Sequence, residues 1–129
     1  MKKEFEQKQL LWSALINILE NALDACLEDH AHKLHKIIFR VSRNEDQILF
    51  EVRDNGIGMD QETKESLFTL FFSSKGNRGT GLGLFITYKI IEQHGGKIIV
   101  DATLGEGSRF LIQMPRVISE SKKKGFNDV

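Results

Sequence analysis

Apolar and polar residues alternate in four short segments of this chain, and the segments occur as two pairs separated by a stretch with helical periodicity. Alternation at two-residue spacing is typical of strands that bury one face. Short turns join the strands of each pair, so each pair is expected to form an antiparallel hairpin. The first strand is expected to bury Ile37, Phe39 and Val41. The predicted strands are 36–43, 47–53, 97–103 and 108–114.

Helices are predicted over residues 5–29, 60–68 and 81–94. In the first of them, apolar residues recur at steps of three and four without an interrupting glycine or proline. Hairpin pairs with helices grouped between them indicate an α+β fold. The expected architecture is a two-layer α/β sandwich, with one mixed or antiparallel sheet covered by about three helices. A doubly wound parallel sheet would need regular strand–helix alternation, which the sequence lacks.

The length of 129 residues suits one compact domain, expected at residues 1–115, and the polar, lysine-rich residues 116–129 are expected to form a flexible tail. The 18 basic and 18 acidic residues cancel, which argues against a nucleic-acid-binding module. No apolar run approaches the roughly 20 residues of a membrane span, so no direct membrane contact is expected. The single cysteine, Cys26, cannot form an internal disulfide, which fits a cytoplasmic location.

Two asparagines, Asn17 and Asn21, lie one helical turn apart, so their side chains are expected to leave the helix on one side. An amide carbonyl is a hard oxygen ligand suited to Mg²⁺, which takes few protein ligands besides water and phosphate oxygens. The alternative is a pair of polar residues on a solvated face. Asparagine is mildly unfavourable inside a helix, however, so two of them within an apolar stretch require an explanation.

The segment Asp54-Asn55-Gly56-Ile57-Gly58 directly follows the second predicted strand. One interpretation is a tight turn, for which Asp, Asn and Gly are the usual residues. The other makes Asp54 a charged acceptor for the adenine amino group, with Gly56 and Gly58 allowing the backbone to approach the base.

Three alternating glycines in Gly79-Thr80-Gly81-Leu82-Gly83 open the third predicted helix. Glycine costs roughly 1 kcal/mol relative to alanine inside a helix. Free backbone amides and the dipole at a helix start bind phosphate oxygens, and Lys75 could add a point charge. The alternatives are a flexible hinge and a solvated lysine. The pattern is not the dinucleotide fingerprint, because Leu84 occupies the third glycine position, and no Gly-Lys-Ser/Thr follows to make a P-loop.

Two other groups of reactive side chains are expected to have no binding role. The cluster His30, His32 and His35 has a spacing more typical of solvated histidines than of a metal site. Cys26 stands among apolar residues and is expected to be packed rather than reactive.

Together, these segments resemble the catalytic and ATP-binding domain of bacterial sensor histidine kinases, within the GHKL ATPase superfamily. The resemblance covers roughly residues 8–115. Residues 15–22 match the N box of that family, 54–59 the first glycine box and 79–84 the second, while 70–72 occupy the position of its phenylalanine box.

The resemblance implies the Bergerat fold, with ATP and Mg²⁺ as ligands. It implies that Asn21 holds the magnesium ion with help from Asn17, and that Asp54 binds the adenine amino group. Residues 69–80 would form a lid over ATP, and residues 79–83 would contact its phosphates. Many relatives carry a basic residue at the position of Asp24, so here a phosphate contact is assigned to Lys75 instead.

The resemblance also implies transfer of the γ-phosphoryl group to a histidine on a dimerisation domain of the same parent kinase, with a response regulator downstream. Superfamily members that hydrolyse ATP or phosphorylate serine usually carry Glu at the position of Asn17, and no side chain here is assigned as catalytic. The chain lacks the family's His-Glu motif, so it is expected to be a fragment of a cytoplasmic or membrane-anchored kinase. A hydrolase or serine kinase of the same fold, a non-catalytic nucleotide-binding module and a phosphate- or peptide-binding module are the alternatives.

Overall fold

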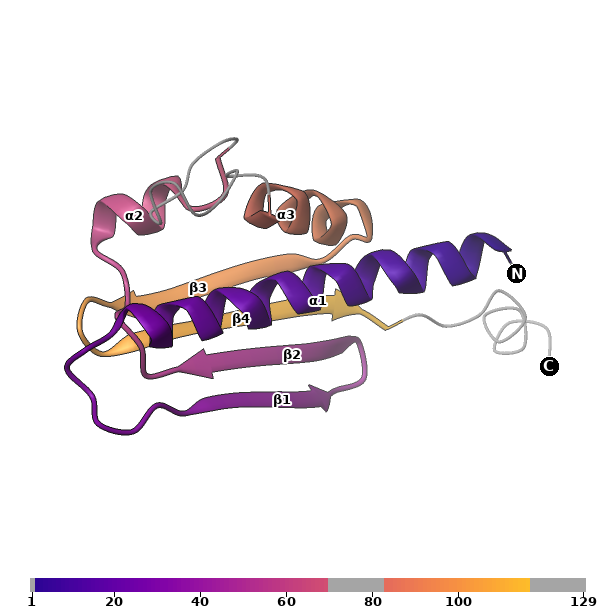
Figure 1. The fold of residues 1–129 in the computed structure, drawn as a ribbon. Coiled ribbons are helices and arrows are strands. Elements are labelled where there is room, and N and C mark those ends of the chain that lie inside the picture. The colour runs from indigo at the N-terminus through magenta and orange to yellow at the C-terminus, as the bar shows by residue number, and fades with distance from the viewer. Residues whose placement is uncertain (1, 70–82, 117–129) are drawn as a thin grey trace.

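The computed structural model describes residues 2–69 and 83–116 of the chain (Figure 1). Each strand and helix that the sequence predicts is present, with ends that differ by a few residues. In chain order the elements are α1 (Lys2–Glu28), β1 (Ile37–Arg43), β2 (Gln47–Asp54), α2 (Gln61–Ser66), α3 (Gly83–Gln93), β3 (Lys97–Thr103) and β4 (Gly107–Pro115).

The strands form a single sheet in the order β1-β2-β4-β3, and each neighbouring pair is antiparallel. The helices lie on one face of this sheet (Figure 1). The predicted two-layer α/β sandwich is therefore confirmed. Of the mixed and antiparallel sheets expected from the sequence, the described strands form the antiparallel one.

The core lies between β4, β2 and the inner face of α1. Alternation along β4 turns Phe110, Ile112 and Met114 toward the helices, and all three are buried. Ile18 and Ala22 of α1 are fully buried in the same cluster. The two-residue period of the strand and the three-to-four-residue period of the helix thus meet in one apolar layer.

Hydrogen bonds at the ends of the elements explain their boundaries. Asp60 caps α2 by accepting a bond from the backbone N–H of Thr63 at 2.8 Å. After α3, Gly95 has a φ of 78°, and the N–H of Gly96 donates to the carbonyl of Ile91 at 2.9 Å. The left-handed glycine thus ends α3 and turns the chain into β3.

The prediction that β1 buries its apolar side chains is wrong. Ile37, Phe39 and Val41 are 37%, 44% and 53% exposed. Their side chains do lie on the helix side of the sheet, because Phe39 pairs with buried Val52 of β2. However, α1 packs on β2, β4 and α3, so the edge strand β1 lies beyond the area that it covers (Figure 1).

The helix α1 bears on the expectation of no membrane contact. Its segment Lys8–Glu28, with a mean hydropathy of 1.3, is long and apolar enough to cross a membrane by length and composition alone. A core helix passes the same test, and α1 contributes Ala14, Leu15, Ile18 and Ala22 to the core.

Replacing Phe110 of β4, which is fully buried, should show how much the core contributes to stability. We expect Phe110→Ala to lower the free energy of unfolding by about 3–5 kcal/mol, because it leaves a cavity between sheet and helices. The matched control is Phe39→Ala on β1, whose side chain is 44% exposed and should cost about 1 kcal/mol or less. Urea unfolding of the two variants measures the difference, and equal losses would contradict this description of the core.

Candidate nucleotide-binding site

Asp54 is the last residue of β2 and carries a buried acceptor that nothing in the described part of the chain satisfies. The residue is 4% exposed. Its Oδ1 atom accepts a hydrogen bond from the backbone N–H of Gly56 at 2.8 Å, whereas Oδ2 is buried without a hydrogen-bond partner. A buried acceptor left unpaired costs about 1–3 kcal/mol. The side chain that the sequence assigns to adenine recognition is thus ready to accept a bond from an external donor.

The electrostatics of Asp54 agree with this geometry. Burial raises the pKa of the carboxyl group, and the backbone amides of Gly56 and Ser108 lower it without offsetting the effect. The ionised form is therefore destabilised relative to water, as expected when a charged group lacks enough donors. A donor that bonds to Oδ2 would stabilise the carboxylate.

The loop after Asp54 packs directly on α1. The backbone N–H of Ile57 donates to the carbonyl of Ala25 at 3.0 Å. A Cβ atom on Gly56 would lie 2.5 Å from the carbonyl carbon of Ala25, so only glycine fits there. Packing against α1 thus explains why glycine occupies position 56. The approach of its backbone to a base stays a prediction.

A second loop, between β3 and β4, holds the first one from the other side. The N–H of Gly105 donates to the carbonyl of Ile57 at 2.7 Å. Gly58, with a φ of 72°, has no room for a Cβ, which would lie 2.0 Å from the carbonyl oxygen of Thr103. Packing against the β3–β4 loop therefore explains why glycine occupies position 58. Its role near a base is still a prediction.

Sequence reasoning treated the β3–β4 loop as a simple turn and missed Gly107 and Ser108. Gly107 has a φ of 119°, and a Cβ there would lie 2.1 Å from the carbonyl oxygen of Asp54. Buried Ser108 pairs in register with Asp54. A Gly-Ser pair that opens a strand was the available signal, but its place beside Asp54 depends on the β2–β4 register.

Asn17 and Asn21 are half-buried on the flank of α1 that faces α3. The amide nitrogen of Asn17 donates to the Thr87 hydroxyl at 3.2 Å and to the Gly83 carbonyl at 3.4 Å. This flank therefore meets the first turn of α3, directly after the glycine-rich segment. Amide oxygens on it would suit Mg²⁺. In the part of the chain that is described, no cluster of three or more His, Cys, Asp or Glu side chains could hold a metal ion.

The remaining predicted phosphate ligands are only partly in view. Gly83 is the first residue of α3 and is exposed, with open space where a Cβ would stand. Lys75, Gly79, Thr80, Gly81 and Leu82 lie outside the described residues, as do residues 70–72 and nearly all of the predicted lid. Their assigned contacts stay predictions.

A shallow pocket of about 260 Å³ lies at the same end of the sheet. Asp54 and Ser108 line it together with Arg53, Asp101 and Arg109. Arg53, Arg109 and Asp101 are paired in register across β2, β4 and β3. Arg53 and Arg109 directly precede and follow Asp54 and Ser108 in their strands, so their side chains lie on the face of the sheet away from the helices. Asn17 and Asn21 do not line this pocket, so it contains only the Asp54 side of the predicted nucleotide site.

Comparison with known proteins agrees with the geometry. The sequence profile described as histidine kinase-, DNA gyrase B- and HSP90-like ATPase matches residues 6–118. The chain belongs to this ATPase family. Its relatives are sensor kinases, and the chain is an ATP-binding catalytic domain of the histidine kinase type.

Among curated proteins, the chain is 37% identical over 121 residues to the sensor kinase CckA of Brucella abortus, which covers 83% of this chain and 12% of that protein. It is 38% identical over 105 residues to sporulation kinase E of Bacillus subtilis, covering 81% of this chain and 14% of that protein. The chain thus spans only a small part of the length of these relatives.

Among solved structures, the catalytic domain of histidine kinase ThkA superposes with a TM-score of 0.68 at 31% identity, covering 83% of this chain and 67% of that one. The mycobacterial sensor histidine kinase MprB gives a TM-score of 0.67 at 26% identity, covering 80% of this chain and 68% of that one. These matches support the fold and the family together.

Substitution of the two glycines in the β3–β4 loop should separate a steric contact from backbone strain. Both Gly105 and Gly107 have positive φ angles, but only a Cβ on Gly107 would meet Asp54. We expect Gly105→Ala to cost about 1–2 kcal/mol of unfolding free energy from the left-handed backbone alone. Gly107→Ala should cost about 2–5 kcal/mol, because overpacking adds to the strain. Denaturant unfolding gives both values, and a smaller loss for Gly107→Ala would contradict the close approach.

Proposed function

We propose that this chain binds MgATP and presents the γ-phosphoryl group to a histidine on a dimerisation domain of its parent kinase. The observation that supports this most directly is the unpaired Oδ2 atom of Asp54, which is buried at the end of β2. The exocyclic amino group of adenine is a donor, and one bond from it satisfies this acceptor. Guanine presents a carbonyl at the equivalent ring position, so the same site discriminates against GTP.

The flank of α1 that carries Asn17 and Asn21 supplies the metal-binding side of the site. Mg²⁺, when bound with the nucleotide, neutralises charge on the phosphates. Asn21 is the ligand, and Asn17 assists while its amide group ties α1 to Thr87 of α3. Lys75, Gly79, Thr80, Gly81, Leu82 and Gly83 contact the phosphates through one ammonium group and backbone N–H groups.

Phosphoryl transfer in this proposal depends on placement more than on covalent participation by the protein. Position 17 is Asn rather than Glu, so it offers no carboxylate to activate water. The accepting histidine belongs to the parent kinase outside residues 1–129. A response regulator then receives the phosphoryl group, and the domain works on the cytoplasmic side, whether or not the parent is anchored in a membrane.

Asp54→Asn should separate binding from folding. The amide oxygen of Asn can still accept the bond from Gly56, and the variant no longer buries a charge, so its thermal stability should equal or exceed that of the wild type. Affinity for an ATP analogue should fall at least about tenfold, because the second oxygen becomes a donor facing a donor. Titration calorimetry measures the affinity, and thermal unfolding measures the stability.

The matched control is Asp46→Asn, which removes one carboxylate from the exposed β1–β2 turn. It should leave nucleotide affinity unchanged. Equal affinity of the wild type and Asp54→Asn would remove the adenine assignment, and competition by GTP as strong as that by ADP would favour a general phosphate-binding module.

ATP turnover tests the transfer step. The isolated chain should hydrolyse ATP very slowly, because Asn17 cannot act as a general base, and should transfer phosphate only when the parent's histidine-bearing domain is added. Release of radiolabelled phosphate and labelling of the added domain measure the two reactions. Rapid hydrolysis by the isolated chain would favour an autonomous ATPase, and nucleotide binding without transfer would favour a non-catalytic module.

A further inference from the structure

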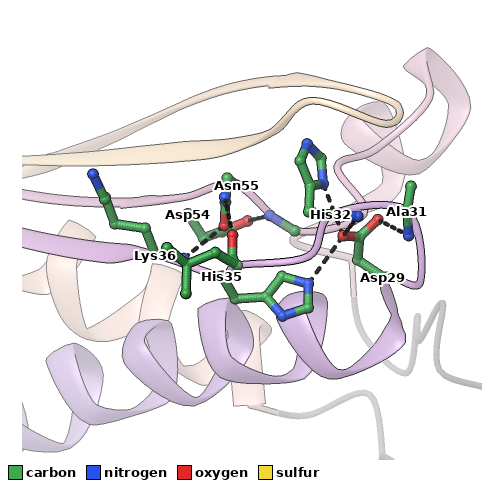
Figure 2. Close-up of polar contacts among 9 residues, drawn as sticks. Asp29, Ala31, His32, His35, Lys36, Asp54 and Asn55 are labelled. Carbon is green, nitrogen blue, oxygen red and sulfur yellow. Dashed lines mark hydrogen bonds and ion pairs between the residues drawn. The ribbon is translucent and has the colours of Figure 1, made fainter.

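A buried carboxylate joins two histidines immediately after α1 (Figure 2). The side chain of Asp29 is 4% exposed, and its Oδ2 atom lies 2.8 Å from Nδ1 of His32 and 2.9 Å from Nε2 of His35. The backbone N–H groups of Ala31 and His32 also donate to this carboxylate, at 3.4 and 3.0 Å. One side chain thus organises the connection between α1 and β1.

This arrangement corrects the expectation that the histidines are solvated. His32 and His35 each keep about a third of the side chain exposed, 35% and 33%, but both point to the same carboxylate oxygen. Burial raises the pKa of Asp29, but bonds from His35, His32 and the two backbone amides outweigh it, so the pKa lies well below its usual range. The carboxylate is therefore ionised at neutral pH.

The far end of the same connection is bonded to the residue next to Asp54. The side chain of Asn55 accepts a bond from the N–H of Lys36 at 2.7 Å and donates to the carbonyl of Leu34 at 2.9 Å. The N–H of Asn55 also donates to the carbonyl of Lys36 at 3.3 Å. Figure 2 shows Asp29 and Asn55 at the two ends of this short segment.

The path from the histidines to the candidate site is therefore short and continuous. Asp29 and the histidines fix residues 29–35, Asn55 fixes residues 34 and 36, and strand β1 then begins at Ile37, which pairs with Asp54. Displacement of the connection would move Asn55, and with it the backbone that carries the carboxylate of Asp54.

We propose that Asp29, His32 and His35 form an ionisable clamp that positions Asp54 for adenine, so that the protonation of the two histidines changes nucleotide affinity. This inference rests on the proposed function, since it concerns the same base-binding carboxylate. Asp29 is a positioning residue: it touches the connection and acts on the nucleotide through Asn55.

The sign of the effect follows from charge. Histidine side chains change charge between about pH 5 and 8. Neutral imidazoles already donate N–H bonds to Asp29, and protonation makes these bonds charge-assisted and stronger. With Asn at position 29 the imidazolium groups would lack their counter-ion, so the loss of Asp29 should be felt more at low pH than at high pH.

Other titratable groups lie on the elements next to the clamp, and Glu28, which is partly exposed, ends α1 directly before Asp29. On α1, the Cys26 thiol faces the carboxylates of Asp54 and Asp29. Burial is the main cause that raises the pKa of this thiol, and the two carboxylates raise it further, so the thiol is neutral in this pH range. The connection itself carries His30, Lys33 and Lys36, which are exposed. At the end of β2, Asp54 is the ionisable group, and its titration is common to the wild type and a variant at position 29.

The experiment compares ADP affinity of the wild type and Asp29→Asn at pH 8 and pH 6 by titration calorimetry. We expect the variant to bind about threefold more weakly at pH 8 and about tenfold more weakly at pH 6. The ratio of the two affinities cancels the titration of ADP and of Asp54. Asp46→Asn is the control for loss of a carboxylate, and its ratio should be one at both pH values.

A double variant, His32→Gln with His35→Gln, keeps hydrogen-bond donors but cannot titrate. At pH 8 it should bind ADP within about twofold of the wild type. At pH 6 it should bind ADP more weakly than the wild type, because it lacks the affinity that protonated histidines add. It also decides the matter if Asp29→Asn fails to fold. An affinity ratio for Asp29→Asn or the double variant that is the same at both pH values would overturn the clamp, whereas a wild-type chain that does not bind ADP would overturn the proposed function instead.

Discussion

The candidate site depends on the contact between α1 and the loop that follows β2. The N–H of Ile57 bonds to the carbonyl of Ala25, and Gly56 approaches the helix backbone more closely than any other residue could. Since Asn17 and Asn21 are on the same helix, this contact fixes the asparagine flank relative to Asp54. The amides predicted to bind Mg²⁺ and the carboxylate predicted to bind adenine come from distant parts of the sequence, and this contact holds them in one frame without a long side chain to span them.

The same contact explains why a destabilising group persists in the fold. Asp54 is buried with one oxygen satisfied and the other unpaired, and two glycine-containing loops hold it there. An unpaired buried acceptor costs about 1–3 kcal/mol, and a donor that bonded to Oδ2 would recover this free energy. Ser108 and Gly107 belong to this arrangement as much as Asp54 does, because the β2–β4 pairing sets them beside it.

Local patterns in the sequence predicted the elements, because strand alternation, helix periodicity and turn residues act over a few positions. The role of Asp54 as an adenine acceptor stays a prediction. Three features escaped, and each depends on distant contacts. Gly107 acquires its role only through the register of β4 with β2. The link from His35 to Asp29 needs the path of the whole connection. The exposure of Phe39 reflects which strands α1 covers, which no pattern within β1 encodes. Predictions for residues 70–82 concern the part of the chain outside the structural description.

Apolar side chains are exposed on α1 as well as on β1. Trp12, Ile16, Leu23 and Leu27 of α1 are 49–64% exposed and share one flank of the helix. The edge strand β1 also carries backbone groups that, among the described strands, pair on one side only. Such surfaces promote association between molecules. The oligomeric state of the isolated domain in solution should therefore vary with protein concentration, and the single tryptophan stands where its emission would register that change.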